Sequence, residues 1–192
     1  MDLKGKRIIL GSNSPRRKEL LSGLNIDFTV DTGNDFEERY SPGTPHLQVP
    51  VLMSEGKSKG FHRALAEDEI LITSDTMVLC GDEIMGKPQD RADAVRMLRL
   101  LSGREHLVVT AVTLRDARRL ETVSDTARVR FKELSDAEID YYVDHFRPFD
   151  KAGAYGIQEW IGYIGIPGIE GSFYTIMGFP VHLVYEKLNL FI

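Results

Sequence analysis

One segment near the N-terminus constrains the fold of this 192-residue chain more than any other. The apolar run Arg7–Leu10 predicts a buried strand, and Lys18–Leu24 predicts a helix that ends near Gly23. Between them, Ser14 suits the N-cap of the helix and Pro15 suits its first position. A strand, a short loop and a helix therefore follow one another directly.

Two arginines, Arg16 and Arg17, fall in the first turn of this predicted helix. The helix dipole favours acidic side chains there, so two cations are unusual. They become favourable if an anion binds beside the unpaired backbone N–H groups, and a phosphate chain is the obvious anion. A capped helix with two solvated arginines fits the same residues. The local pattern leaves both interpretations open.

The composition limits the classes of function. A net charge of −5 argues against sequence-independent nucleic-acid binding, although a local basic cluster can still bind a small anion. The single cysteine, Cys80, excludes an intramolecular disulfide and suits a reducing compartment. The N-terminus has no apolar signal core, and no apolar run approaches the length of a membrane span. We therefore expect a cytoplasmic protein without membrane or nucleic-acid partners.

The rest of the chain alternates between predicted strands and helices, with no linker or repeat. Asp90 and Ser135 are expected to cap helices that run to about residues 101 and 145. Gly56 and Gly60 weaken one helix, because an interior glycine costs roughly 1 kcal/mol relative to alanine. Further strands are expected at 26–30, 70–73, 77–80, 83–85, 107–115 and 122–131, further helices at 51–66 and 181–190, and a glycine-rich region lining a cleft at 153–178.

An acidic residue, Asp75, follows the predicted strand at 70–73 within the triplet Ser74-Asp75-Thr76. Functional groups of α/β sheets are commonly found at strand ends. A carboxylate there can ligate Mg²⁺ or act as a base toward water, with a pKa set by its burial. An aspartate that only caps a turn would look the same in the sequence.

Three lysines and two glutamates are further candidates with weak local context. Lys87 lies in a Gly-Lys-Pro loop from which its ammonium could reach a phosphate, and Lys57 and Lys59 lie on a predicted helix. Glu37 and Glu38, in a polar loop, could hold a metal ion that bridges phosphate oxygens. Each of these side chains could equally be a solvated surface residue that binds no ligand. The five histidines have no ligand spacing, so we expect no zinc site.

The run from Asp150 to Gln158 is the other informative segment. Its small residues let the backbone approach a ligand closely. Tyr155 can stack on a ring, and Gln158 can offer both a donor and an acceptor to the edge of a base. A loop at the edge of the core could have the same composition. The combination of this loop with the basic, acidic and strand-end residues favours a nucleotide ligand.

The order of these motifs resembles that of the Maf-like nucleoside triphosphate pyrophosphatases over essentially the whole chain. Several such motifs in this order are highly specific, although no single one is. The segments that carry the resemblance are Gly11–Arg17 followed by Glu19–Leu21, Ser74–Thr76, Gly86–Pro88, Met97–Leu98, Leu101–Gly103, Thr110–Val112, Lys151–Gln158 and Gly178–Pro180.

The resemblance implies an α/β fold, with an elongated, twisted mixed sheet and flanking helices around a central cleft, similar to inosine triphosphatase folds. It implies a single domain over residues 1–192, with two closely packed lobes as a variant, in a family that is often dimeric. The implied reaction is hydrolysis of a nucleoside triphosphate between its α and β phosphates. The implied cofactor is a divalent cation, Mg²⁺ or Mn²⁺.

The resemblance also assigns roles to residues. Asp75 corresponds to the proton acceptor and takes part in metal binding together with Glu38, for which Glu37 is an alternative. The residues that correspond to phosphate contacts are Ser12, Arg16, Lys57 and Lys87, with Arg17 as a helper.

The resemblance extends to substrate choice. Arg16, Thr76 and Gln158 match the branch of the family that acts on dTTP and UTP. Two features depart from the family pattern. Glu159-Trp160-Ile161 replaces a glycine after Gln158, which could reshape a base pocket, and Gly56 interrupts the helix that carries Lys57.

Two other functions remain open at this point. A nucleotidyltransferase also combines a basic glycine loop with a lysine and a metal-binding aspartate, but it needs a second substrate. A regulatory nucleotide-binding protein linked to cell division and septum formation would bind nucleotide without turnover. Pyrophosphate release from a triphosphate and water alone would distinguish the enzyme from both.

Overall fold

The computed structural model describes residues 2–192. Contacts within the chain divide it into two compact units. Unit 1 comprises the residues up to Asp75, Thr110–Asp125 and Gly178–Ile192, and unit 2 comprises Thr76–Val109 and Thr126–Met177. The single domain expected over residues 1–192 stays a prediction. None of the helices within residues 2–192 has both the length and the apolar character needed to cross a membrane.

Seven strands form one mixed sheet, as the predicted α/β fold requires. The order is β2-β1-β3-β5-β6-β7, with β4 paired to β3. β1 runs parallel to β2 and β3, whereas β4 and β7 are antiparallel to their neighbours. The strands are β1 (Arg7–Leu10), β2 (Phe28–Val30), β3 (Glu69–Cys80), β4 (Glu83–Met85), β5 (Glu105–Arg115), β6 (Leu120–Arg130) and β7 (Gly168–Glu170).

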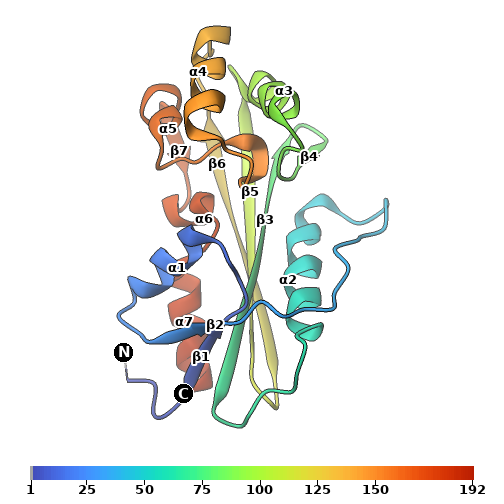
Figure 1. The fold of residues 1–192 in the computed structure, drawn as a ribbon, viewed down its shortest axis with the longest axis vertical. Helices are drawn as coiled ribbons and strands as arrows, with labels where there is room; N and C mark the ends of the chain where they lie inside the picture. The colour runs from blue at the N-terminus through green and yellow to red at the C-terminus, as the bar shows by residue number, and fades with distance from the viewer. Residues whose placement is uncertain (1) are drawn as a thin grey trace. The chain divides into compact units, whose positions relative to one another are not determined.

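In unit 1, helices flank the strands on two sides. Figure 1 shows α1 (Pro15–Ser22) and α7 (Val181–Phe191) to the left of β3 and α2 (Val49–Lys59) to its right. A short 3₁₀ turn, η1 (His46–Gln48), precedes α2. The predicted start of α1 is confirmed: the Ser14 side chain accepts a hydrogen bond from the Arg17 backbone, and Pro15 opens the helix.

Helix α2 ends at Lys59, so the predicted helix at 51–66 is wrong in its second half. Gly60 caps the helix, and Phe61 then forms a bridge to Asn34. Phe61 is buried in a cluster with Ile9 and Leu71. Burial of this aromatic ring against the sheet therefore outweighs continuation of the helix.

Strand β3 does not end at Ser74 as predicted but continues to Cys80. Its partners change along its length: β1 pairs with Glu69–Ile72, and β4 pairs with Val78–Cys80. Asp75 thus lies inside a strand rather than at its end. It lies three residues beyond Ile72, which pairs with the last residue of β1. Asp75 therefore lies in β3 just beyond the point where the neighbouring strand β1 ends.

Unit 2 contains the remaining helices. Its two long helices, α3 (Arg91–Leu101) and α4 (Asp136–Phe146), pack together, and Arg91 makes ion pairs with two aspartates of α4. Both predicted caps are confirmed, since Asp90 and Ser135 accept hydrogen bonds from the first turns of these helices. The glycine-rich region is more helical than expected: it contains η2 (Ala152–Ala154), α5 (Trp160–Gly165), β7 and α6 (Phe173–Met177).

Candidate functional site

The Lys57 ammonium of unit 1 contacts two carboxylates. Its Nζ lies 2.6 Å from Asp75 Oδ1 and 3.2 Å from Glu38 Oε1. The side chains of Lys57 and Asp75 are 20% and 18% exposed, whereas that of Glu38 is 60% exposed. Three of the residues singled out from the sequence, from a loop, a helix and a strand, are thus brought together.

A buried hydroxyl network fixes α2, and with it Lys57, against the sheet. Ser54 lies one helical turn before Lys57, and its hydroxyl donates to the Thr73 carbonyl at 3.2 Å. The Thr73 hydroxyl donates back to the Ser54 carbonyl at 2.8 Å. The Ser54 hydroxyl also lies 2.8 Å from that of Thr113 in β5. Because residues three apart share a helix face, this anchoring directs Lys57 toward the strand that carries Asp75.

Two glycines, one within α2 and one at its C-terminal cap, accommodate the loop that carries Glu38. The Phe36 ring lies where a side chain at Gly56 would be, within 2.2 Å of an ideal Cβ. A Cβ at Gly60 would lie 2.7 Å from Phe36 Cβ. Asn34 completes the attachment by donating from its side chain to the Lys57 carbonyl. The glycine that departs from the family pattern therefore has a structural purpose, which is close approach of the acidic loop.

Arg17 is partly buried, and its guanidinium donates to two backbone carbonyls. Its Nε donates to the Gly178 carbonyl at 3.0 Å, and its Nη1 donates to the Ser74 carbonyl at 2.9 Å. Burial and, to a smaller extent, nearby Arg16 lower the pKa of the Arg17 guanidinium to about 10, while Asp75 opposes the shift. Arg17 therefore remains a cation at neutral pH and fixes the strand segment directly before Asp75.

The other two residues of the predicted phosphate loop lie beside Arg17. Ser12 is buried, and its hydroxyl oxygen accepts from the Ser14 backbone at 3.2 Å and from Arg17 Nη1 at 3.4 Å. Arg16 is partly exposed and close enough to affect the pKa of Arg17. The loop thus gathers two guanidinium groups at the start of α1, as expected for an anion site.

Burial raises the pKa of the Asp75 carboxyl above its ordinary value, and nearby Glu38 raises it further. The charge and hydrogen bond of Lys57, and the charge of Arg17, oppose this rise. A carboxylate with a raised pKa is a better proton acceptor than an exposed one. The same two cations also make the charged form tolerable in this partly buried position.

The donor set of Asp75 and Glu38 fits a divalent cation bound together with a ligand. Both carboxylates already surround one positive charge, the Lys57 ammonium. Residues 2–192 contain no cluster of three or more histidine, cysteine or acidic side chains that could hold a metal ion by itself. Mg²⁺ commonly takes one or two carboxylates and completes its shell with water and phosphate oxygens. The two carboxylates meet that requirement.

The remaining predicted residues, Thr76, Lys87 and Gln158, belong to unit 2. Thr76 is partly exposed in β3, and Lys87 is exposed in the loop after β4. The Gly153 backbone donates to the Gly86 carbonyl at 3.0 Å, so the loops that carry Lys87 and Gln158 are joined. Oε1 of Gln158 is buried and has no hydrogen-bond partner.

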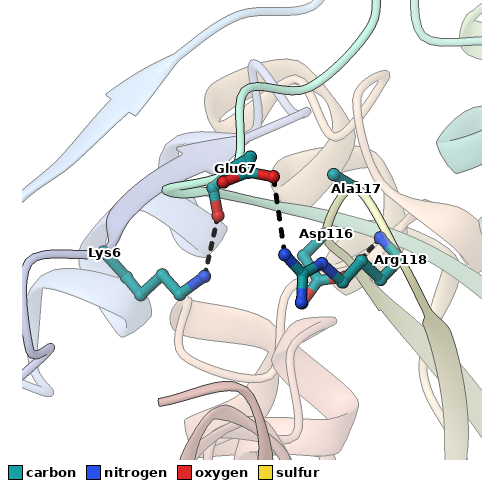
Figure 2. A pocket seen from close by; sticks show the side chains of 5 residues that line it. All are labelled: Lys6, Glu67, Asp116, Ala117 and Arg118. Carbon is teal, nitrogen blue, oxygen red and sulfur yellow. Dashed lines mark hydrogen bonds and ion pairs between the residues drawn. The ribbon is translucent and has the colours of Figure 1, made fainter.

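A hollow of about 230 Å³ lies elsewhere in unit 1 and contains none of the predicted site residues. Figure 2 shows its five lining residues, which are Lys6, Glu67, Asp116, Ala117 and Arg118. Lys6 Nζ donates to the Glu67 carbonyl at 2.8 Å, and Arg118 lies 3.4 Å from the Glu67 carboxylate. Its charged groups therefore pair with one another, and we assign no ligand to it.

Sequence reasoning missed the residues that support the site. Ser54, Thr73 and Thr113 could have been noticed only as hydroxyls within otherwise apolar segments. The sequence analysis also gave no role to Tyr142, which donates from its hydroxyl to the Glu159 carboxylate. These partners are separated by 17 to 59 residues, so no local pattern relates them.

Comparison with known proteins gives the following matches. A family model described as "Maf-like protein" matches residues 7–191. The dTTP/UTP pyrophosphatase of Porphyromonas gingivalis (strain W83) is 50% identical, over 99% of this chain and 96% of that protein. Proteins of the same name from Bacteroides thetaiotaomicron and Christiangramia forsetii are 47% and 44% identical, over 95% and 97% of this chain and 95% of each relative. The solved structure of the Staphylococcus aureus Ham1 protein has a TM-score of 0.42 at 15% identity, over 66% of this chain and 72% of that one.

Proposed function

We propose that this chain, which belongs to the Maf-like protein family, is a nucleoside triphosphate pyrophosphatase that acts on dTTP and UTP. The observation that carries the proposal is the name shared by relatives that are 50%, 47% and 44% identical over nearly their whole length. The pairing of Lys57 with Asp75, beside two arginines, supports it with a site suited to phosphate chemistry.

In the proposed reaction, water attacks the α-phosphorus and the bond to the bridging oxygen of the β-phosphate breaks. The electron pair leaves with pyrophosphate, and the nucleoside monophosphate gains the hydroxyl. Asp75 orients the water and accepts its proton, for which its raised pKa is suited. Arg16, Lys57 and Lys87 bind the phosphates and stabilise the negative charge on the departing group.

Glu38 and Asp75 would hold a divalent cation, Mg²⁺ or Mn²⁺, which when bound neutralises charge on the phosphate oxygens. The Lys57 ammonium now occupies the space between these carboxylates. When a triphosphate enters, Lys57 exchanges its contacts with the two carboxylates for contacts with phosphate oxygens. The same side chain thus keeps the carboxylates compensated in the free protein and contacts the ligand in the complex.

The proposal also assigns the choice of base to three residues. Arg16, Thr76 and Gln158 match the branch of the family that takes thymine and uracil. Gln158 supports this assignment because its buried Oε1 lacks a protein partner and can accept a hydrogen bond from a ligand. We further propose a cytoplasmic protein that forms a homodimer, which light scattering of the purified protein would test.

The deciding experiment measures pyrophosphate release by the purified protein with Mg²⁺ or Mn²⁺. Its substrates are dTTP, UTP, CTP, the purine triphosphates and triphosphates with modified bases. Monophosphate and pyrophosphate from dTTP and UTP are the expected products. Release that requires a second nucleotide or alcohol acceptor would instead indicate a nucleotidyltransferase. Nucleotide binding without turnover, in folded protein and with either metal, would indicate a regulatory role.

A further inference from the structure

Three side chains of unit 2 converge on one point above Gly156. An ideal Cβ on this glycine would lie 3.0 Å from Glu159 Cδ, 3.0 Å from Lys151 Cε and 3.1 Å from Gln158 Nε2. The nitrogen end of the Gln158 carboxamide therefore faces the same space as the Glu159 carboxyl group. The oxygen end, Oε1, is buried and has no partner in the protein.

Glu159 is held in place by two other residues. Lys151 Nζ lies 3.0 Å from Glu159 Oε1, and its side chain is only 9% exposed. The Tyr142 hydroxyl donates to Glu159 Oε2 and accepts from the Gly156 backbone at 3.0 Å. Burial raises the pKa of Tyr142, so this hydroxyl keeps its proton. The carboxylate is thus fixed by a charged partner and a neutral one.

The Glu159 carboxylate shares its charged partner with another residue. Lys151 Nζ also contacts a second carboxylate, Asp150 Oδ1, at 2.8 Å. The single ammonium therefore compensates the Glu159 carboxylate only in part, and negative charge remains beside the Gln158 amide. A carboxamide nitrogen is a donor and its oxygen an acceptor, so the nitrogen end is favoured next to this charge. An amide turned by 180° would place its oxygen against the Glu159 carboxylate.

This orientation matters because a carboxamide can match either kind of pyrimidine edge. Uracil and thymine present an imide N–H at position 3, which needs an acceptor. Cytosine presents an acceptor at that position and an amino donor beside it, which the turned amide would match. Glutamine by itself therefore does not discriminate between them. A neighbour that holds the amide in one orientation is needed.

We propose that Glu159, held by Lys151 and Tyr142, is a positioning residue that fixes the Gln158 amide with its oxygen available, and so selects uracil and thymine against cytosine. This inference rests on the proposed function, since it assumes that Gln158 contacts the base. It also gives a purpose to the replacement of the family's glycine by Glu159. The residue acts through Gln158 rather than on the reacting phosphates.

The principal test compares Glu159→Gln with the wild-type protein. The substitution keeps the size of the side chain and removes the charge, so both amide orientations become accessible. We expect the ratio of kcat/KM for UTP to that for CTP to fall about tenfold, as for the loss of about 1.4 kcal/mol of discrimination. The ratio should fall largely because CTP turnover rises, while kcat for UTP changes little. A merely structural defect would lower the rates for both substrates together.

Asp150→Asn supplies a second variant that leaves the contacts of Glu159 with Lys151 and Tyr142 intact. Its side chain is half exposed, and the change removes one of the two carboxylates that share the Lys151 ammonium. We expect the UTP preference to fall in the same direction by a smaller factor. Glu133→Gln, the same chemical change at an exposed position of unit 2, is the matched control and should leave the ratio unchanged.

Binding of the product nucleotides separates this inference from the proposed function. Calorimetric titration with UMP and CMP gives the same discrimination ratio without turnover. A wild-type protein that hydrolyses no triphosphate would refute the proposed function, and the UMP-to-CMP ratio of Glu159→Gln would still decide the role of Glu159. An unchanged ratio in folded Glu159→Gln, by turnover and by binding, would overturn the inference. A lowered ratio in that variant and in Asp150→Asn would establish it.

Discussion

In unit 1 the Lys57 ammonium lies between two carboxylates, whereas in unit 2 the amide oxygen of Gln158 has no protein partner. In unit 1 the ammonium already compensates the charge of the two carboxylates, so a ligand must replace contacts that already exist. In unit 2, Lys151 and Tyr142 both contact Glu159, and Gln158 Oε1 beside them is left without a protein partner. The comparison indicates that variants in unit 1 should change rate and charge balance, and variants in unit 2 should change recognition and loop stability.

The largest expected effect is that of Asp75→Asn. The amide keeps the shape of the side chain but cannot accept a proton, so turnover of UTP should fall by about 10² to 10⁴-fold. Circular dichroism and thermal unfolding should show a folded protein. Full activity in this variant would refute Asp75 as the proton acceptor and would remove the basis for treating unit 1 as the reacting side.

A large effect on stability is expected at His106, which anchors the loop of unit 2. His106 Nε2 lies 2.7 Å from the Tyr155 hydroxyl, and burial lowers the pKa of the imidazole to about 4. Below its ordinary pKa near 6.5 the unfolded chain gains a proton that the folded chain does not. The free energy of unfolding should therefore fall by about 3 kcal/mol from this group as the pH drops from 6.5 to 4.

His106→Gln provides the comparison for this prediction. The amide can still reach the Tyr155 hydroxyl but has no titrating proton in this range. Urea titrations of both proteins at pH 7 and pH 4.5 should give a smaller loss of stability for the variant. Equal losses would mean that His106 is not the group responsible.

A third prediction concerns the pH dependence of the reaction. Lys57 opposes the rise in the pKa of Asp75, so Lys57→Met should raise that pKa further. In the pH profile of kcat/KM, activity falls on the acidic side as Asp75 becomes protonated. In the residual activity of Lys57→Met, this acidic limb should move to higher pH. Lys59→Met, on the same helix and with its ammonium exposed to solvent screening, is the control and should leave the limb unmoved. An unshifted limb in Lys57→Met would argue that another group titrates.

The smallest effect is expected at Lys87. Its side chain is exposed in the loop after β4, so its removal leaves no buried group unpartnered. Lys87→Ala should raise KM for UTP several-fold with little change in stability, because one exposed cation contributes about 1 kcal/mol or less to an ionic contact. Higher salt should diminish the difference between variant and wild type. A loss as large as that of Asp75→Asn would place Lys87 at the reacting centre instead.

Elements determined by local chemistry could be predicted from the sequence. The caps at Ser14, Asp90 and Ser135 were predicted and are confirmed. The strands predicted at 107–115 and 122–131 are confirmed as β5 and β6, and in the turn between them Asp116 accepts from the backbone of Arg118 and Arg119. In each case the decisive hydrogen bonds join residues a few positions apart.

Features determined by distant partners could not be predicted. The end of α2 depends on burial of Phe61 against strands far along the chain, and the continuity of β3 depends on which strands pair with it. The family resemblance assigned roles to Lys57 and Asp75 but did not predict their contact. The role of Glu159 depends on Tyr142, which lies on another helix. Sequence reasoning therefore named most candidate residues but not the contacts that position them.

Gly56 has a consequence for anyone who wishes to stabilise this protein by design. Replacing a helical glycine with alanine commonly gains about 0.4 to 1 kcal/mol by restricting the unfolded chain. Here the added methyl group would lie 2.2 Å from an atom of the Phe36 ring, and Glu38 follows two residues later. A scheme that ranks positions by helix propensity would choose Gly56 early. The substitution is meant to raise the melting temperature, but it would displace Phe36 and with it the acidic loop that carries Glu38.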